Sequence, residues 1–503
     1  MKSRWHRSVL AQAGGLILVT ASTLTVYAGS NVQAASKPCA GVTLNVITQP
    51  PPYIAGPVLR VEKAWDAKTG GKINLITVPY SELYSKIMTS FITGTNSYDV
   101  ILFGSDWLGD FYPYLRPLNS YVHHDPGLKW QNILYTKNAY WGKTLYAMPL
   151  DGDNMAAYYQ RSLFANKTFQ SEFQKEFHYP LAAPTTWNQY LNIAKFFDGK
   201  VVNGHKIYGD LGAYQRGGQA FWFYMAIAAS YSTLKGPNGA PEPGLFFNPT
   251  NMDPLINDPG HLAALKIYLQ LLKYGPPGMI NFNSEDVRST FATGVAAEAY
   301  DWADTGIVAD LSKGTKVKGN TQTIPLPGTH RVWDYRTNKW VSFTTPSQPT
   351  WLAFGGWKGA IPKTSLHPAC AYNFLSYLGS PKQSLISVTS PATGFNPYRV
   401  HQFTDLKAWY KAGYVKSDLV PYLKVLKHNI TDPFQIHDLA IPGEAAYVDA
   451  LELNTSEAAA GQETPAQALN RTAAAWNQIT NKLGRAKQLK LYDEELKTFG
   501  MSW

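Results

Sequence analysis

The stretch Tyr146–Phe164, YAMPLDGDNMAAYYQRSLF, contains two β-prone runs separated by Asp151-Gly152-Asp153. An Asp-Gly pair between two such runs is typical of a β-hairpin. The alternative interpretation is that the chain leaves one lobe here and enters a second, with Asp151 and Asp153 at the mouth between the lobes. The stretch by itself leaves both interpretations open.

Length and composition favour an ordered protein with more than one core. A chain of 503 residues is too long for one compact core and predicts two lobes or domains. Hydrophobic residues make up 45% and charged residues 16%, which is far from a disordered composition. The 31 Tyr and 15 Trp indicate either an aromatic-rich core or carbohydrate recognition, in which an aromatic face packs against a sugar ring.

The N-terminal segment resembles a secretory signal. Basic residues in its first part precede an apolar region from about Ala13 to Ala28, and Val32-Gln33-Ala34 forms a small-residue cleavage site. We therefore predict a signal peptide over residues 1–34 and an exported, periplasmic or extracellular protein. An uncleaved N-terminal anchor is the alternative, and no lipid-attachment motif precedes Cys39.

The net charge is positive but dispersed. The formal charge of +10 includes three basic residues of the predicted signal, and no run of five Lys or Arg occurs. A nucleic-acid groove concentrates its positive charge, so this pattern indicates a mildly basic solvated surface and no nucleic-acid partner.

The first part of the mature chain alternates between strand-like and helix-like segments. These are, in order, Val42–Ile47, Leu59–Lys68, Ile73–Val78, Ser81–Phe91 and Val100–Phe103. The alternation predicts a parallel sheet covered by helices, in which ligands bind beyond the carboxyl ends of the strands. The candidate ligand-binding residues at those ends are Gln49, Tyr80, Ser105, Asp106 and Trp107.

Two later segments carry further candidates. Phe221 and Trp222 follow the glycine-rich stretch Tyr208–Gln219, and they form either the start of a buried helix or an aromatic platform for a ligand at a helix N-terminus. Asp301 and Trp302 follow an apolar strand and predict a second cluster at a strand end.

Motifs spread over most of the chain resemble those of the extracellular solute-binding proteins of family 1, the maltose-binding-protein-like receptors of sugar-importing ABC transporters. In family order they are Trp65 with Thr69-Gly70, Phe91 with Thr93-Gly94 and Tyr98-Asp99-Val100, Tyr146 with Pro149 and Tyr158-Tyr159, Phe291 with Gly294, and Gly394 with Pro397 and Arg399. Each motif alone is weak, and their succession carries the resemblance.

The resemblance implies an α/β fold of the type II periplasmic-binding-protein class, with two lobes joined by a multi-strand hinge around a ligand cleft. We expect one lobe over residues 35–150 and 350–402 and the other over 151–349 and 403–503. It adds Gly356, Trp357 and Arg399 to the candidate ligand residues, although Arg399 is equally suited to neutralising a neighbour. The expected protein is a monomer without a cofactor that captures a sugar or polyol by hinge closure and delivers it to a membrane permease.

The chain has two cysteines, Cys39 and Cys370, which are too few to form a zinc site. In an exported chain they either pair or remain isolated thiols. The family layout places them in the same lobe, so the resemblance implies a disulfide as a hypothesis.

A secreted glycoside hydrolase is the enzyme alternative, because two carboxylates suffice for that chemistry. The candidate carboxylates are Asp106, Asp151, Asp153 and Asp301. The sequence has no nucleophile elbow, metal motif or phosphate loop, and carboxylates also accept hydrogen bonds from bound sugars. A purely structural surface protein explains neither the lobe crossing nor the aromatic clusters, so we favour a binding protein.

Overall fold

The structure is a computed structural model that describes residues 37–391 and 393–501. From Pro38 onward the described residues form one compact unit. The predicted signal peptide over residues 1–34 lies outside the described residues.

The first sheet has five strands in the order β2-β1-β3-β15-β6. Their bounds are Thr43–Thr48 for β1, Lys72–Thr77 for β2, Val100–Gly104 for β3, Met148–Pro149 for β6 and Trp357–Ala360 for β15. Strand β1 pairs in parallel with β2 and β3, which confirms the parallel core predicted from the alternating pattern. Strand β15, from a later part of the chain, lies between β3 and β6 and is antiparallel to both.

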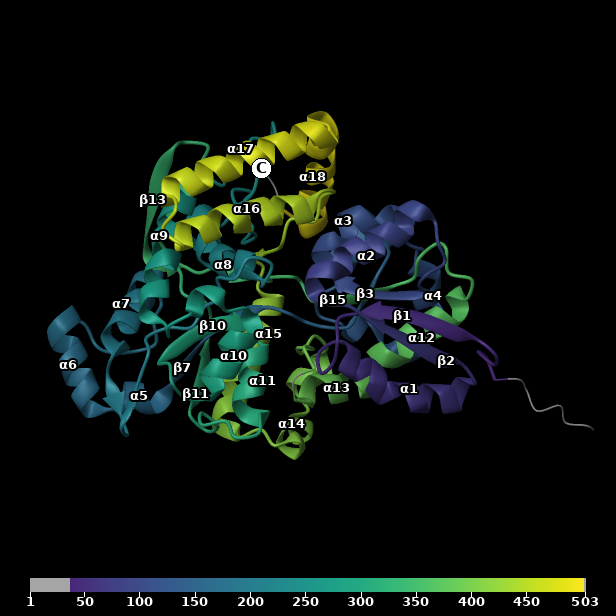
Figure 1. Ribbon diagram of the computed structural model, residues 1–503, viewed down its shortest axis with the longest axis horizontal. Helices are drawn as coiled ribbons and strands as arrows, with labels where there is room; N and C mark the ends of the chain where they lie inside the picture. The colour runs from purple at the N-terminus through teal and green to yellow at the C-terminus, as the bar shows by residue number, and fades with distance from the viewer. Residues whose placement is uncertain (1–36, 392, 502–503) are drawn as a thin grey trace, which may run out of the picture. The chain divides into compact units, whose positions relative to one another are not determined.

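Helices cover both faces of this first sheet. Figure 1 shows α1 (Ala55–Thr69) and α12 (Pro368–Gly379) on one side, and α2 (Tyr80–Thr93) and α3 (Leu108–Phe111) on the other. Helix α1 buries an apolar stripe that includes Val58, Val61 and Trp65. A helix with one apolar face is stable only when that face is covered, here by the sheet.

The second sheet has three antiparallel strands in the order β10-β7-β11. They span Met155–Gln160 (β7), Glu298–Trp302 (β10) and Thr321–Ile324 (β11). Residues Met155–Tyr158 of the central strand are all buried. A central strand covered on both faces needs apolar residues throughout, and this explains its sequence MAAY.

The chain crosses between the two sheets within Tyr146–Phe164. Strand β6 belongs to the first sheet and β7 to the second, so the hairpin interpretation is wrong. Residues Asp151, Gly152 and Asp153 lie in the crossing segment. The chain returns to the first sheet through β15, which follows β14 (Thr350–Trp351). The lobe boundaries given above stay a prediction.

The remaining helices and strands surround these sheets. Three helices next to the second sheet are α10 (Ser284–Ala292), α11 (Asp304–Leu311) and α15 (Lys416–Thr431). Further helices are α4 (Asn119–His123), α5 (Arg161–Ala165), α6 (Lys167–Phe177), α7 (Trp187–Phe197), α8 (Ala220–Ser232), α9 (Pro259–Leu271), α13 (Pro381–Thr389), α14 (Leu406–Ala412), α16 (Glu444–Ala459), α17 (Pro465–Leu483) and α18 (Arg485–Phe499). Short strand pairs are β4 (Tyr140–Trp141) with β5 (Thr144–Leu145), β8 (Val201–Val202) with β9 (His205–Lys206), β12 (Thr329–Asp334) with β13 (Lys339–Ser347), and β14 with β16 (Gln435–Ile436).

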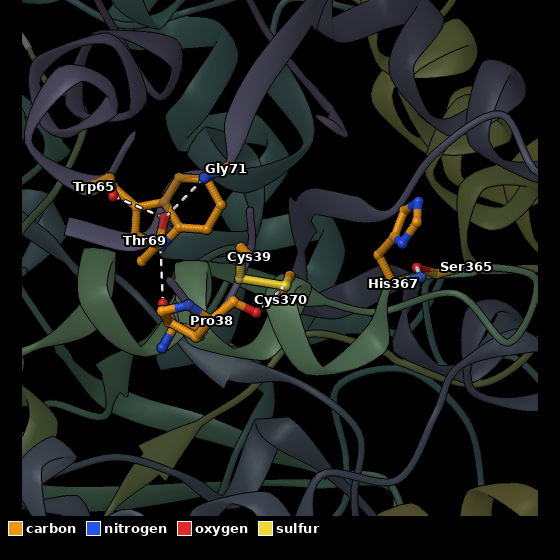
Figure 2. Close-up of a disulfide and its surroundings, with 9 residues drawn as sticks. Pro38, Cys39, Trp65, Thr69, Gly71, Ser365, His367 and Cys370 are labelled. Carbon is orange, nitrogen blue, oxygen red and sulfur yellow. Dashed lines mark hydrogen bonds between the residues drawn. A yellow bond between two sulfur atoms is a disulfide. The ribbon is translucent and has the colours of Figure 1, made fainter. Parts of the chain in front are cut away.

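A disulfide joins Cys39 to Cys370 across 331 positions of sequence, with the two Cα atoms 5.8 Å apart. Figure 2 shows the bond between the segment that precedes β1 and helix α12. The main-chain N–H of Cys39 also donates to the carbonyl of Thr69, at the end of α1. The start of the described chain is therefore fixed to two helices of the first sheet.

Among the described residues, none of the helices combines the length and the apolar character that crossing a membrane requires.

Candidate ligand-binding site

A cavity of about 170 Å³ lies where loops and strand ends from both sheets meet. We call it the Arg288 cavity, and its walls combine aromatic rings with carboxyl, amide and hydroxyl groups. The lining residues are Gln49, Tyr53, Tyr80, Asp153, Gly217, Gly218, Gln219, Asn283, Ser284, Glu285, Arg288, Trp302, Asp304, Phe354, Trp357 and Gly394. Cavities that mix apolar faces with a few polar groups are typical binding sites for small molecules.

The positive charge of this cavity is held in an ion-pair network. The guanidinium of Arg288, on α10, lies 3.1 Å from Asp301 and 3.5 Å from Asp304. Burial opposes its charge, but the two carboxylates outweigh burial and raise the pKa of Arg288. Burial also raises the pKa of Asp301 to about 6, against the effect of Arg288. Thr305 donates a 2.6 Å hydrogen bond that holds the Asp301 carboxylate in place.

Asn396 connects this network to the crossing segment. Its side-chain amide donates to Asp153 at 2.8 Å and to Asp304 at 3.1 Å. The pKa of Asp153 is raised well above its usual value by burial, and the charges of Asp151 and Asp304 raise it further. Because one amide satisfies two buried carboxyl groups, its orientation is fixed by its partners.

Asp151 holds the crossing segment itself. Its carboxylate accepts main-chain N–H groups of Gly152 at 2.7 Å, Asn396 at 2.5 Å and Trp357 at 3.2 Å. Gly356 lies against the same segment with φ of 84°, and a Cβ there would meet the Asp151 carbonyl oxygen at 2.5 Å. Asp151 therefore acts on the backbone of three segments and does not line the cavity.

A second cavity, of about 460 Å³, shares Tyr80, Gly217 and Gln219 with the first. We call it the Asp106 cavity. Its lining residues are Tyr80, Ser81, Tyr84, Ser85, Asp106, Trp107, Arg216, Gly217, Gln219, Trp222, Glu444, Ala445, Val448, Asp449 and Glu452. The rings of Tyr80 and Trp107 are stacked with centroids 5.6 Å apart, so part of the wall is aromatic.

The N-terminus of α8 opens between these cavities. The carboxylate of Glu452 accepts the main-chain N–H of Gly217 at 2.6 Å and that of Phe221 at 2.9 Å. A carboxylate at a helix N-terminus satisfies free N–H groups and complements the helix dipole. The sequence left open whether this helix end contacts a ligand or is the start of a buried helix. In the structure its N–H groups are bound by a side chain of the protein.

The structure brings many of the predicted site residues together. Gln49, Tyr80, Asp153, Trp302 and Trp357 line the Arg288 cavity, and Tyr80, Asp106, Trp107 and Trp222 line the Asp106 cavity. The indole N–H of Trp302 donates to the carbonyl of Ala353 at 3.0 Å, which fixes the ring at the return crossing.

Other predicted residues lie outside both cavities. These are Ser105, Asp151, Phe221, Asp301, Gly356 and Arg399. Ser105 donates to the Phe354 carbonyl at 2.8 Å. Arg399 is buried and donates to the carbonyls of Leu128 and Gly379, at 3.0 and 2.6 Å. These bonds satisfy the carbonyls at the ends of two segments. They also hold the charged group of Arg399 away from both cavities.

Several residues that line the Arg288 cavity were not predicted as ligand-binding residues, including Tyr53, Gln219, Glu285, Arg288, Asp304 and Phe354. Asp304 lies two residues after Trp302, so proximity to a predicted site residue was an available signal. Arg288 looks like an ordinary surface charge of an amphipathic helix, and only the tertiary structure shows that it is buried. No group of three or more His, Cys, Asp or Glu side chains suited to a metal ion occurs among the described residues.

A family model described as bacterial extracellular solute-binding protein matches residues 59–384, more than half of the chain. The chain belongs to this family. A search of curated protein sequences gave no match. Members of the bacterial extracellular solute-binding protein family are binding proteins, so the site described above belongs to a protein whose role is to bind a solute.

Solved structures share the fold of this chain. A solute-binding protein of an ABC transporter from Agrobacterium radiobacter K84, in complex with ribitol, has a TM-score of 0.69 at 20% identity, covering 88% of this chain and 100% of that chain. MalE3 of T. maritima with maltose bound has a TM-score of 0.68 at 18% identity, covering 87% and 100%. An ABC transporter solute-binding protein from Agrobacterium vitis S4 with D-mannitol has a TM-score of 0.66 at 19% identity, covering 88% and 99%.

These similarities establish the fold of this solute-binding protein. It is the type II periplasmic-binding-protein fold, with two α/β lobes, strands that connect them and a ligand cleft between them. The fold class predicted from the sequence is therefore confirmed.

Proposed function

We propose that this protein captures a sugar or polyol in the Arg288 cavity and delivers it to the permease of an ABC importer. The observation that carries the proposal is the composition of the cavity. Trp302 and Trp357 supply flat apolar surfaces, while Asp153 and Gln49 supply acceptors and donors for hydroxyl groups. Sugars and polyols present this same combination of C–H faces and hydroxyl groups.

Three further observations support this ligand class. The structures that share the fold carry ribitol, maltose and D-mannitol. Burial raises the pKa of Tyr53 to about 12, so its hydroxyl stays protonated and is able both to donate and to accept. The volume of about 170 Å³ fits a small solute.

The proposed mechanism is closure of the two lobes around the solute. The cavity takes residues from the first sheet and its loops, such as Tyr80 and Trp357, and from the second sheet, such as Trp302. A solute that contacts both sets binds the closed arrangement more tightly than the open one, so it shifts the population toward closure. The closed form then docks on a membrane permease.

We propose that the protein performs no catalysis on this solute. Asp151 is engaged by three main-chain N–H groups, and Asp301 is engaged by Arg288 and Thr305. Asp153 is engaged by Asn396. Two carboxyl groups that flank a scissile bond must be free to move a proton, and of the four candidates this leaves Asp106 alone.

Thermal unfolding of the mature protein against polyols, monosaccharides and oligosaccharides tests the proposal. A solute that binds the folded state raises the unfolding temperature by mass action. We expect a shift with a solute that chromatography then recovers unchanged. No shift across the panel contradicts the ligand class, and a shift with conversion of the solute supports the hydrolase.

A further inference from the structure

The carboxyl group of Asp106 has no side-chain hydrogen-bond partner in the described part of the protein. Asp106 follows β3, in the short helix Ser105–Trp107, and it lines the Asp106 cavity although only 1% of its surface is exposed. No side chain of the described residues donates to either of its oxygen atoms, and the main-chain N–H groups of Asp106 and Trp107 lie near the carboxyl group without the geometry of a regular hydrogen bond. A buried carboxyl group without a protein partner is costly, and it is available to a ligand that enters the cavity.

The lining of this cavity contains more acidic side chains than basic ones. Glu444, the first residue of α16, is 2% exposed, and its Oε2 atom has no hydrogen-bond partner in the described chain. Arg216 is the basic residue of the lining, and its guanidinium lies 2.7 Å from Asp449, so that pair is already balanced. Asp106 and Glu444 remain without a cationic partner among the described residues that line the cavity.

Aromatic rings complete the walls around these carboxyl groups. Tyr80 and Trp107 are stacked, and Tyr84 meets Trp107 edge to face at 5.5 Å. Trp222 lines the same cavity, and its indole N–H donates to both oxygens of Asp438 at 3.0 Å. The negative face of an aromatic ring attracts a cation, most strongly when the cation is an organic ammonium that has lost its water.

We propose that the Asp106 cavity binds an organic ammonium group, with Asp106 and Glu444 as its counter-ions and Tyr80 and Trp107 as its aromatic wall. The proposal rests on the proposed solute-binding function, because this cavity shares part of its lining with the Arg288 cavity. It specifies the charge of the solute: the sugar or polyol that this protein captures carries an ammonium group.

The groups around Asp106 and Glu444 predict that proton release accompanies binding. Burial raises the pKa of Asp106 well above its usual value and the charge of Asp438 raises it further, while its own N–H, that of Trp107 and the charge of Lys358 act in the opposite direction. Burial likewise raises the pKa of Glu444, and the charge of Asp106 raises it further, followed by those of Asp438, Asp110 and Glu452. Burial therefore favours the protonated form of the Asp106 carboxyl group before a cation arrives.

An arriving cation favours the ionised carboxylate, so the group loses its proton to the solvent as the complex forms. The bound state then carries fewer protons than the free state, and the affinity for the cation rises with pH until the free carboxyl group is itself ionised. A neutral hydroxylated solute gives no such effect, because a protonated carboxyl group is already able to donate to and accept from hydroxyl groups.

The test compares choline with 3,3-dimethylbutan-1-ol, which replaces the charged nitrogen by carbon at nearly the same size. Isothermal titration calorimetry at neutral pH, repeated in two buffers of different ionisation enthalpy, gives both the affinity and the number of protons released. We expect saturable binding of choline with proton release, and binding of the neutral alcohol at least about tenfold weaker. Equal affinities for the two probes, or no binding of either, overturn the proposal.

Two variants and a control assign the effect to this cavity. Asp106→Asn keeps the shape of the side chain, and we expect it to weaken choline binding at least about tenfold and to abolish most of the proton release. Glu444→Gln is expected to weaken binding in the same direction. Glu176→Gln removes one negative charge from the exposed part of α6 and is expected to leave both quantities unchanged.

Choline binding with unchanged proton release in Asp106→Asn also overturns the proposal, because the ammonium would then lie elsewhere. Failure of the proposed function looks different: no sugar or polyol, neutral or amino-substituted, raises the unfolding temperature of the wild-type protein, whatever choline does.

Discussion

The side-chain amide of Asn396 donates a 3.1 Å hydrogen bond to the carboxylate of Asp304, although the two residues are 92 positions apart in sequence. The loop that carries Asn396 follows α13, next to the first sheet, whereas Asp304 begins α11, next to the second. The bond therefore joins the surroundings of both sheets at the edge of the Arg288 cavity. A hydrogen bond between these two parts of the protein limits how far the cavity residues near the first sheet separate from those near the second.

We predict that Asn396→Ala destabilises the protein and weakens solute binding. The change removes donors to two buried carboxyl groups, Asp153 and Asp304, and each lost partner of a buried group costs about 1–3 kcal/mol. Urea unfolding followed by circular dichroism measures the loss. Asn96→Ala, in the exposed loop after α2, serves as the matched control, and equal stability of the two variants contradicts the prediction.

Trp302→Ala is expected to weaken solute binding by about 1–3 kcal/mol, because the indole supplies an apolar wall of the cavity. The same change is expected to lower stability, since the ring is buried and bonded to Ala353. Trp302→Phe keeps an aromatic face and should retain most of the affinity. Calorimetric titration with the solute found in the thermal panel decides the matter, and an unchanged affinity in Trp302→Ala would place the ring in the core alone.

Removing the disulfide is expected to lower the free energy of unfolding by about 2–5 kcal/mol, because the bond closes a loop of several hundred residues in the unfolded chain. The variant Cys39→Ser/Cys370→Ser should bind solute normally, since neither residue lines either of the two cavities. The midpoint of guanidinium unfolding with and without reductant measures the effect. If reductant leaves the wild-type midpoint unchanged, the bond does not form in solution or does not stabilise the protein.

Asp210 predicts a pH-dependent contribution to stability. Burial raises its pKa to about 7, although Tyr190 donates a 2.6 Å hydrogen bond to it. In the unfolded chain its pKa is about 4, so between about pH 4 and 7 the folded state binds a proton that the unfolded state releases. The favourable contribution is complete below about pH 4 and is lost as the pH rises through 7.

The variant Asp210→Asn lacks this titration and keeps an acceptor for Tyr190. We expect it to gain stability relative to wild type as the pH rises from 4 to 8, by about 2–4 kcal/mol in total. Thermal unfolding of both proteins across this pH range measures the difference. A difference that stays constant with pH would mean that Asp210 ionises alike in both states.

The first sheet was predictable from sequence because its early strands and helices are local and regular. Leu59–Lys68 and Ser81–Phe91 carry helical spacing, and α1 and α2 lie over those segments with a few more residues at their ends. The crossing at Asp151 was not decidable from local signals. Asp-Gly favours a hairpin in any context, and only the partners of β6 and β7, which are far apart in sequence, settle the matter.

The candidate site was predictable in part for a related reason. Aromatic residues at strand ends, such as Trp107 and Trp302, are visible in the sequence because the strands before them are. Whether a polar residue faces a cavity or serves the backbone depends on its partners. Arg399 and Asp151 are residue types that often contact ligands. Here Arg399 donates to main-chain carbonyls and Asp151 accepts from main-chain N–H groups of distant segments.

The carboxylate of Asp151 holds the crossing segment through N–H groups of the main chain, which any residue except proline supplies. The side chains of Trp357 and Asn396 therefore do not contribute to this anchor, even where their own N–H groups do. Substitutions of side chains in the cleft therefore leave the hydrogen bonds of Asp151 to the main chain in place. The ligand preference of the cleft is able to change in evolution while the connection between the lobes stays the same.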